Sequence, residues 1–239
     1  MIKSLHRSSI LLAILCGSLT LTLLLLALAT HGSQGMFQLN RPIAEYSALL
    51  IARATALRID LAIDFLYLCS YAAFFVMLVP TLRSFQRDTA EKYASFSGSS
   101  IWLGALLLTA VLDATENAHI LSMLTATEKG LPLTSDSITW QVAESQLKFV
   151  SSYFGLFLLS FYLPTESLIE KCFAFVLRWM QAPVGVAIFV LPAEIVKPFF
   201  LARALFFVFG FWTMAWIIYR RSTTQINVAT PSFPLGSCA

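Results

Sequence analysis

Apolar residues fill six long stretches of this chain, and short polar segments separate them. A helix that crosses a hydrocarbon layer of about 30 Å needs about 20 apolar residues, with about 17 as the lower limit. Six stretches meet this length, and they cover approximately residues 9–29, 60–80, 101–122, 147–163, 172–191 and 199–219. The pattern predicts an all-α fold, a polytopic membrane helix bundle with about six transmembrane helices.

The six predicted spans form a single transmembrane domain over residues 1–222. The sequence contains no glycine-rich phosphate loop and no convincing internal repeat. Residues 223–239, which follow the last span, are polar and include two prolines, so we expect a disordered tail.

Two segments allow alternative interpretations. The first span follows Lys3 and Arg7 and ends in "ALA" at 27–29, which also fits a cleaved signal peptide, although its long apolar core favours an uncleaved anchor. Residues 166–198 fit either a full span kinked at Pro183 or an interfacial helix followed by a re-entrant piece. We prefer the full span, because the alternative would place the basic pair at 220–221 on the outer side.

The distribution of basic residues predicts that both termini are cytoplasmic. With the amino terminus inside, nine of the 16 Lys and Arg residues lie on the inner side. The short loop "TLRSFQRDTAEKY" and the final "YRRS" contribute several of them, and the positive-inside rule gives short flanking loops the greatest weight.

Composition narrows the class of protein. Hydrophobic residues make up 58% of the chain and charged residues 12%, which is typical of membrane proteins. The net charge of +3 comes from scattered basic residues, so we expect no nucleic-acid partner. The four cysteines form no C-x-x-C pair, and only one of the three histidines, His119, lies in an apolar stretch. We therefore expect no metal and no cofactor.

Polar residues recur on one face of several predicted spans. At about 100° per residue, Asp60, Asp64, Tyr67 and Tyr71 form a stripe on the second span, with Arg53 on its extension. On the third span Thr109, Asp113, Glu116 and Asn117 share one side, whereas His119 points away. The fourth span has a polar and small face that includes Gln141, Ser145, Lys148 and Ser152.

These charges also share a depth. Measured from the inner ends of the spans, Asp64, Glu116, Lys148 and Arg203 lie about 22 to 24 Å up, and Asp113 about 18 Å. An isolated charge at the centre of a membrane helix costs about 2.5 to 3.5 kcal/mol, so these side chains should face one another or water. We predict a charged cavity in the outer half of the membrane, open toward the outer side. Its residues are Asp64, Tyr67, Asp113, Glu116, Asn117, Lys148, Ser152 and Arg203.

In the simplest arrangement, Lys148 and Arg203 neutralise carboxylates of the second and third spans, and Asn117, Tyr67 and Ser152 complete the hydrogen bonds. Charges nearer the helix ends can reach headgroup water instead. We place Arg53, Arg58, Asp60, His119 and Lys197 in that interfacial group, and Glu194 and Lys197 at the outer end of the bundle. Ion pairs that fix packing without any ligand are the structural alternative to a functional cavity.

The run "IDLAIDFLYLCSYAAFF" followed by "GALLLTAVLDATEN" resembles a pattern of small uncharacterised bacterial inner-membrane proteins, an Asp-Phe span and then a D-x-x-E-N span. It covers about a quarter of the chain. The resemblance implies location in a bacterial-type inner (plasma) membrane, and it implies no activity.

Three functions fit these features. The chain binds or translocates a small solute, ion or proton, or it is a membrane enzyme acting on a lipid or isoprenoid, or it is an accessory subunit of a larger membrane complex. Whether the protein is an enzyme stays open. Buried carboxylates such as Glu116 or Asp113 suit a general acid or base, but no nucleophile with a base at recognised spacing is present. Membrane lipids are expected partners, and a homo-oligomer or a larger complex is compatible with the sequence.

Overall fold

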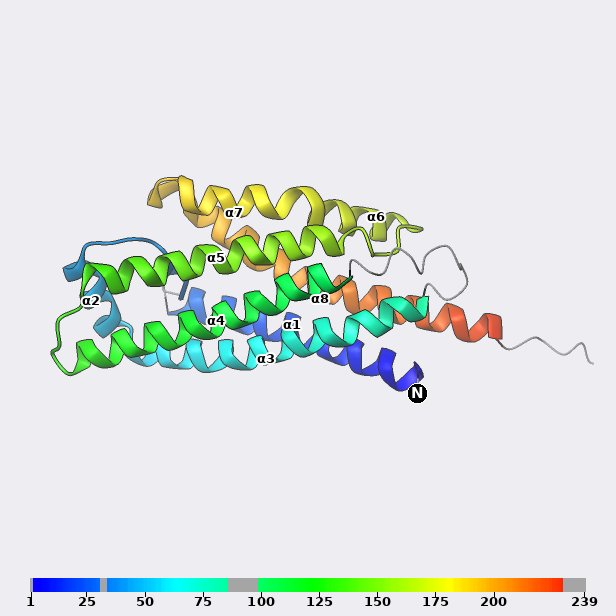
Figure 1. Cartoon of the computed structure of the whole chain (residues 1–239), viewed down its shortest axis with the longest axis horizontal. Helices are drawn as coiled ribbons and strands as arrows, with labels where there is room; N and C mark the ends of the chain where they lie inside the picture. Colours follow the sequence, from blue (N-terminus) through cyan, green and yellow to red (C-terminus); the bar gives the residue numbers. More distant parts are fainter. Residues whose placement is uncertain (1, 31–33, 86–98, 230–239) are drawn as a thin grey trace, which may run out of the picture.

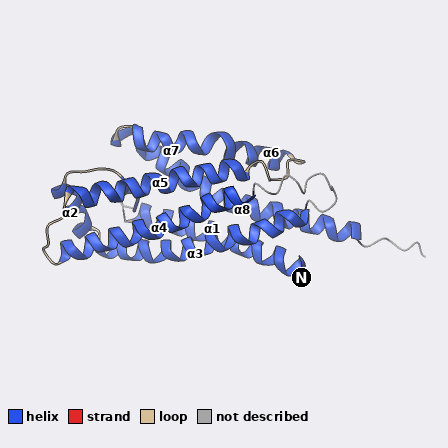
Figure 2. Ribbon diagram, in the orientation of Figure 1, coloured by secondary structure: helices blue, strands red, loops and turns tan. Residues whose placement is uncertain are grey.

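The computed structural model describes residues 2–30, 34–85 and 99–229, and all regular structure in these ranges is helical (Figures 1 and 2). The elements are α1 (Ile2–Ala29), η1 (Gln34–Gln38), α2 (Ile43–Ala52), α3 (Ala54–Phe85), α4 (Ser99–Glu128), α5 (Ser135–Leu159), α6 (Leu168–Phe175), η3 (Val176–Met180), α7 (Gln181–Val190) and α8 (Ala193–Ala229). The predicted all-α class is therefore confirmed for the described residues.

Five helical segments are long and apolar enough to cross a membrane. They are Lys3–Ala29, Ala54–Phe85, Ser100–Glu128, Leu168–Val190 and Pro198–Thr224. The predicted span 147–163 is not among them. It belongs to α5, which begins much earlier, at Ser135, and whose first half carries most of its polar residues. At about 1.5 Å per residue, the 25 residues of α5 extend about 37 Å, so its length matches that of its neighbours.

The helices form a ring around a shared interior. α1 packs against α8 and α3, α4 packs against α3 and α5, and α7 joins α5 to α8. Figure 1 shows the continuous segment α6–η3–α7 lying along α5, and α8 crossing obliquely behind the other helices. η1 and α2 lie at one end of this ring, called here the η1 end. The chain begins, and α8 finishes, toward the opposite end, called here the termini end.

The segment 168–190 is helical throughout, with a change of winding in its middle. η3 is a π-helical turn directly before α7, and Pro183 lies in the first turn of α7. A proline has no backbone N–H to donate to the preceding turn, and a π turn is one way to accommodate that loss. The local distortion at Pro183 is therefore a change of helical winding within one continuous helical segment.

A polar network connects α6 to α8 at the termini end. Arg221 pairs with Glu166 at 2.7 Å and with Glu170 at 2.8 Å. Glu170 also completes a capping box with Ser167 at the start of α6. Arg221 thus connects the start of α6 to α8. α8 continues to Ala229, so residues 223–229, predicted to belong to a disordered tail, are helical, and the rest of that tail lies beyond the described residues.

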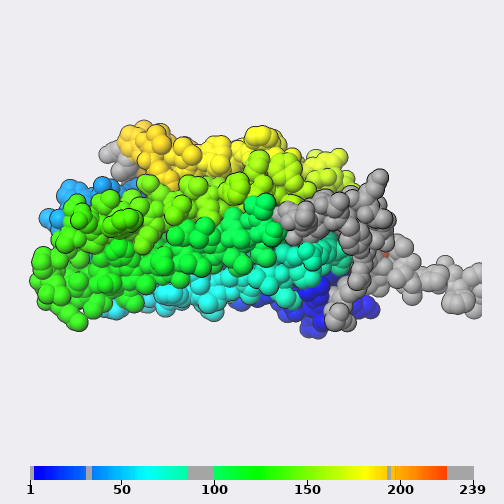
Figure 3. Space-filling model, viewed as in Figure 1, coloured from blue at the N-terminus to red at the C-terminus, as the bar shows by residue number. Residues whose placement is uncertain are grey.

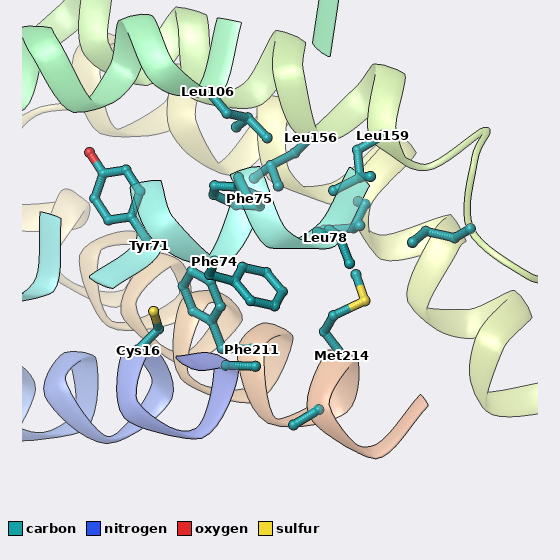
Figure 4. Packing of buried hydrophobic residues seen from close by; sticks show 14 of the residues in the cluster. Cys16, Tyr71, Phe74, Phe75, Leu78, Leu106, Leu156, Leu159, Phe211 and Met214 are labelled. Carbon is teal, nitrogen blue, oxygen red and sulfur yellow. The ribbon is translucent and has the colours of Figure 1, made fainter. Parts of the chain in front are cut away.

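Two apolar clusters fill the interior. The larger lies toward the termini end and includes Phe74, Leu78, Trp102, Phe211 and Met214 (Figure 4). The smaller lies at the η1 end, where Phe37, Tyr46, Leu50, Ile120 and Leu124 pack together. The layer between the clusters contains most of the buried charged side chains: Asp60, Asp64, Asp113, Glu116, Lys148 and Arg203.

The outer surface of the ring is also rich in apolar side chains. Figure 3 shows α4 and α5 closely packed along one face, and exposed residues of these helices include Ile101, Val111, Leu147 and Val150. Large apolar side chains exposed in this number suit a lipid environment. The five apolar helices and this surface are compatible with a membrane protein.

Close packing between α4 and α5 depends on Gly155. A methyl group at this position would lie 2.7 Å from Leu106 Cγ and 3.2 Å from the Trp102 carbonyl oxygen. We expect Gly155→Ala to reduce the free energy of unfolding by about 1 to 3 kcal/mol, because an overpacked interface must shift. Unfolding in mixed detergent micelles measures this change.

Gly104→Ala is the matched control, because a methyl group at Gly104 meets nothing within 4 Å. It should be neutral or stabilising by up to about 1 kcal/mol, owing to the higher helix propensity of alanine. Equal effects of the two substitutions would contradict the packing of α4 against α5.

Candidate functional site

Lys148 on α5 is the centre of the buried polar layer. Its ammonium donates to Asp113 Oδ1 at 2.7 Å and to Glu116 Oε2, and its side chain is 7% exposed. Asp113 and Glu116 are three residues apart on α4, so their carboxyl groups emerge on one face and reach the same ammonium. Three of the charges predicted from residue spacing to share a depth, Asp113, Glu116 and Lys148, are therefore in contact.

The two carboxylates of α4 are fully hydrogen-bonded. Asp113 Oδ2 accepts from the Tyr71 hydroxyl at 3.2 Å. Glu116 Oε1 accepts from Ser145 Oγ at 2.7 Å and from Gln141 Nε2 at 3.2 Å. Every oxygen of both carboxylates thus has a donor, which satisfies the requirement that buried charges be paired and hydrogen-bonded.

Asp64 and Asp60 form a second acidic group on α3. Asp64 Oδ2 accepts from Asn117 Nδ2 at 2.6 Å, and Asp60 Oδ2 accepts from the backbone N–H of Gln34 at 2.9 Å. Both side chains are buried, so the prediction that Asp60 reaches headgroup water is wrong. The reason is that η1 folds over this end of α3 and covers Asp60.

Arg203 on α8 is buried but pairs with no carboxylate among the described residues, so the predicted neutralising role is wrong. Its Nη2 donates to Gln38 Oε1 at 3.0 Å, and its guanidinium lies 3.8 Å from the ring centroid of Phe149. Nη1 makes no hydrogen bond with a described residue. The buried Tyr153 hydroxyl interacts with Arg203 electrostatically, and it too lacks a hydrogen bond of good geometry.

Two glutamines of η1 close the polar layer at the η1 end, and sequence reasoning missed both. Gln34 Nε2 donates to Asn117 Oδ1 at 2.5 Å, and Gln38 lies between Arg203 and Glu116, to which it donates at 3.5 Å. Both lie in a short polar connector, whose sequence has no periodicity to indicate where its side chains point. The available signal was the spacing of two amides, four residues apart, around the apolar pair Met36-Phe37.

α2 adds a further connection to the same network. The Tyr46 hydroxyl donates to Gln141 Oε1 at 3.1 Å, and Gln141 in turn donates to Glu116. Burial and the nearby Glu116 carboxylate raise the pKa of Tyr46, so this hydroxyl remains a donor over the physiological range. Hydrogen-bonded side chains thus cover part of the η1 end, and the predicted opening toward the outer side stays a prediction.

The remaining predicted residues lie at the edge of the network or apart from it. Tyr67 packs on the ring of Tyr71 at 5.0 Å and lines the same cavity as Ser152. His119 pairs with Glu144 at 3.1 Å on a half-buried surface, away from Lys148, and Arg58 pairs with Glu128 on the exposed surface. The side chains of Glu194 and Lys197 lie outside the described part of the chain.

A cavity of about 880 Å³ connects the polar layer with the larger apolar cluster. At its polar end the lining includes Asp60, Asp64, Asp113, Lys148 and Arg203. Toward the termini end the lining is apolar, with Phe74, Leu156, Leu159, Phe173, Phe211 and Met214. This volume falls within the range of about 300 to 1,000 Å³ typical of small-molecule sites.

Some residues that line the cavity, near the ends of α1 and α8 closest to η1, are also exposed on the surface of the bundle. Leu28 of α1 and Leu201 of α8 both line the cavity and are 58% and 43% exposed. In a membrane, apolar side chains at these positions would face lipid rather than water. These helix ends are therefore the candidate entrance to the chamber from the side of the bundle.

Family models, curated proteins and solved structures were all compared with this chain, and none of them matches it.

Removing the charge of Lys148 should lower the stability of the protein strongly, and removing the two carboxylate charges as well should restore it. Lys148→Met leaves Asp113 and Glu116 buried without a cation, and we expect it to reduce the free energy of unfolding by about 3 to 5 kcal/mol. Combining it with Asp113→Asn and Glu116→Gln should restore most of this loss, because the uncompensated charges are then removed. Unfolding in mixed detergent micelles measures all of these variants.

Lys129→Met is the control, since Lys129 is exposed at the end of α4. It should change stability by no more than a few tenths of a kcal/mol. A Lys148→Met protein as stable as this control would show that Lys148 does not hold the two carboxylates together.

Proposed function

We propose that the protein is a multi-pass membrane protein that binds a small ligand in the chamber beside Lys148 and passes it between the membrane and the outer side. The observation that carries the proposal is the contact of a buried charge network with a cavity large enough for a ligand. Ion pairs that serve packing alone need no adjoining space. Here three buried carboxyl groups and two buried cations line one cavity of about 880 Å³.

In this proposal α5 is a sixth span and both termini are cytoplasmic. Support for the sixth span comes from the length of α5 and from its packing between α4 and α7. The polar face of α5 lies against α4, where Lys148 and Ser145 bond Asp113 and Glu116. Pairing of this kind lowers the cost of placing α5 within the hydrocarbon layer.

A second candidate is an enzyme that acts on a lipid inside the chamber. The long apolar part of the cavity favours it, because a hydrocarbon chain fits there beside Asp64 and Asp113. Catalysis and transport differ in their products. A ligand recovered with an unchanged mass after incubation supports binding or transport, and a changed mass supports catalysis.

Filling the chamber tests the proposal. Ser152 lines the cavity one helical turn from Lys148 and is buried. We expect Ser152→Leu to remove most of any ligand that co-purifies with the protein, because the larger side chain occupies ligand space while keeping α5 helical. Native mass spectrometry of the purified protein measures the bound mass and its occupancy.

Ser18→Leu, at an exposed position of α1, controls for a general effect of the substitution. It should retain the ligand occupancy of the unmodified protein. If the unmodified protein carries no small molecule and binds none added, the chamber is a packing device and the proposed function is wrong.

A further inference from the structure

We propose that the ligand is an amphiphile, whose anionic head, a phosphate or a carboxylate, binds Arg203 and whose hydrocarbon chain lies along α8. This inference rests on the proposed function and specifies its ligand class. It is carried by three observations: a buried cation with no ion pair among the described residues at one end of the cavity, a long apolar arm beyond it, and exposed apolar lining residues near that cation.

The first observation is that the carboxylates bound to Lys148 have all their hydrogen bonds, whereas Arg203 does not. Asp113 and Glu116 have donors on all of their carboxylate oxygens, and Lys148 is bound to both carboxylates. Arg203 is 8% exposed and lines the cavity, and its Nη1 makes no hydrogen bond of good geometry with a described residue, although the Tyr153 hydroxyl interacts with the guanidinium. A buried N–H without a well-formed hydrogen bond is costly, so an acceptor beside it is stabilising. Phosphate and carboxylate oxygens form the strongest hydrogen bonds with a guanidinium.

Arg203 is also held in place without a ligand. Its guanidinium lies over the ring of Phe149, and Gln38 takes one of its N–H groups. The free edge of the guanidinium is therefore preorganised, so little side-chain entropy is lost when an anion binds.

The chamber and its border contain four buried carboxyl groups and two buried cations, so an anionic head binds only together with protons. Asp64 lines the same cavity, accepts one hydrogen bond from Asn117, and has no cation within ion-pair distance among the described side chains. An anionic head adds to the charges of the carboxyl groups near Asp64, so it is tolerated when Asp60 and Asp64, which have no ion pair among the described side chains, are protonated. A phosphate monoester that keeps one O–H adds only a single negative charge.

The apolar arm follows α8 away from Arg203. Gly210, Phe211 and Met214 line the cavity in succession along α8. Met214 lies 11 residues after Arg203, which places it about 16 Å farther along the helix. Phe173 and Leu177 of the α6–η3–α7 segment line the same arm. The apolar arm and the charged end of the cavity therefore suit one elongated molecule with a polar head.

The exposed apolar lining residues would admit such a molecule from the bilayer. Leu28 and Leu201 line the cavity and are exposed, and Leu201 is two residues from Arg203 on α8. A hydrocarbon chain that moves from lipid into an apolar arm gains little free energy, since lipid tails and apolar side chains are similar in polarity. The head must therefore provide most of the selectivity.

Binding measurements with four probes test this assignment. The protein in lipid nanodiscs is titrated with oleoyl lysophosphatidate, oleate, monoolein and inorganic phosphate, and bound masses are counted by native mass spectrometry. We expect one or both of the anionic oleoyl probes to bind at least about tenfold more tightly than monoolein, which has the same chain without a charge. Inorganic phosphate alone should bind weakly, because without a hydrocarbon chain it is not concentrated in the bilayer. Equal binding of monoolein and the anionic probes would overturn the assignment.

Arg203→Gln tests the role of the head. It should weaken the anionic probe by about 10- to 100-fold and leave monoolein binding unchanged, because it removes a charge-assisted hydrogen bond. Arg58→Gln removes a surface arginine and should have no effect on either probe. Anion binding that survives Arg203→Gln in a folded protein would contradict the proposal.

Gly210→Leu tests the arm and does not depend on the stability of the Arg203 variant. An added Cβ at Gly210 meets only Phe173 Cε2, at 3.9 Å, so a leucine side chain enters the cavity without a clash at its base. We expect loss of oleoyl probe binding with an unchanged melting temperature. Gly104→Leu, whose Cβ meets nothing within 4 Å, should bind like the unmodified protein. Equal probe binding by Gly210→Leu and Gly104→Leu would contradict the placement of the hydrocarbon chain along α8.

The outcomes also separate this inference from the proposed function. A neutral or cationic ligand that is displaced by Ser152→Leu keeps the chamber as a binding site and overturns the anionic head. If no ligand is bound and Ser152→Leu changes nothing, both the anionic head and the proposed function are overturned.

Discussion

The pairing of Lys148 with Asp113 and Glu116 is the interaction on which the rest of the structure depends. Among lipid chains the hydrophobic effect gives helices little reason to choose one partner over another, so packing and polar contacts decide their arrangement. One ammonium from α5 bonds two carboxylates of α4, and Gly155 allows the two helices to approach closely. Rotation or sliding of either helix would expose charges to hydrocarbon, which fixes the register.

This network also creates the chamber. It lies between two apolar clusters, and the glutamines of η1 complete its hydrogen bonds on one side. On the other side the polar layer borders the cavity, which continues among aromatic side chains toward the termini end. Charged and apolar surfaces therefore meet inside one cavity, a combination that suits an amphiphile better than a small inorganic ion.

Helical periodicity and residue spacing predicted the all-helical class and the polar faces of α3, α4 and α5. Residues such as Asp113, Glu116 and Lys148 could be placed at one height, because rise per residue and the cost of burying charge are general properties. The ligand-binding role of these residues stays a prediction. The environment of Arg203 was not predictable, since it depends on Gln38 and Phe149, which come from a connector and from another helix. The course of η1 was missed because a short polar connector has no periodicity to indicate which way its side chains point.

Cryo-electron microscopy of the protein in nanodiscs made from its native lipids tests the central claim most directly. The account predicts density for the Lys148 side chain between Asp113 and Glu116, and elongated density that begins at Arg203 and continues toward Met214. A map in which the α4 carboxylates face lipid, or in which protein side chains fill the space beside Arg203, would contradict it.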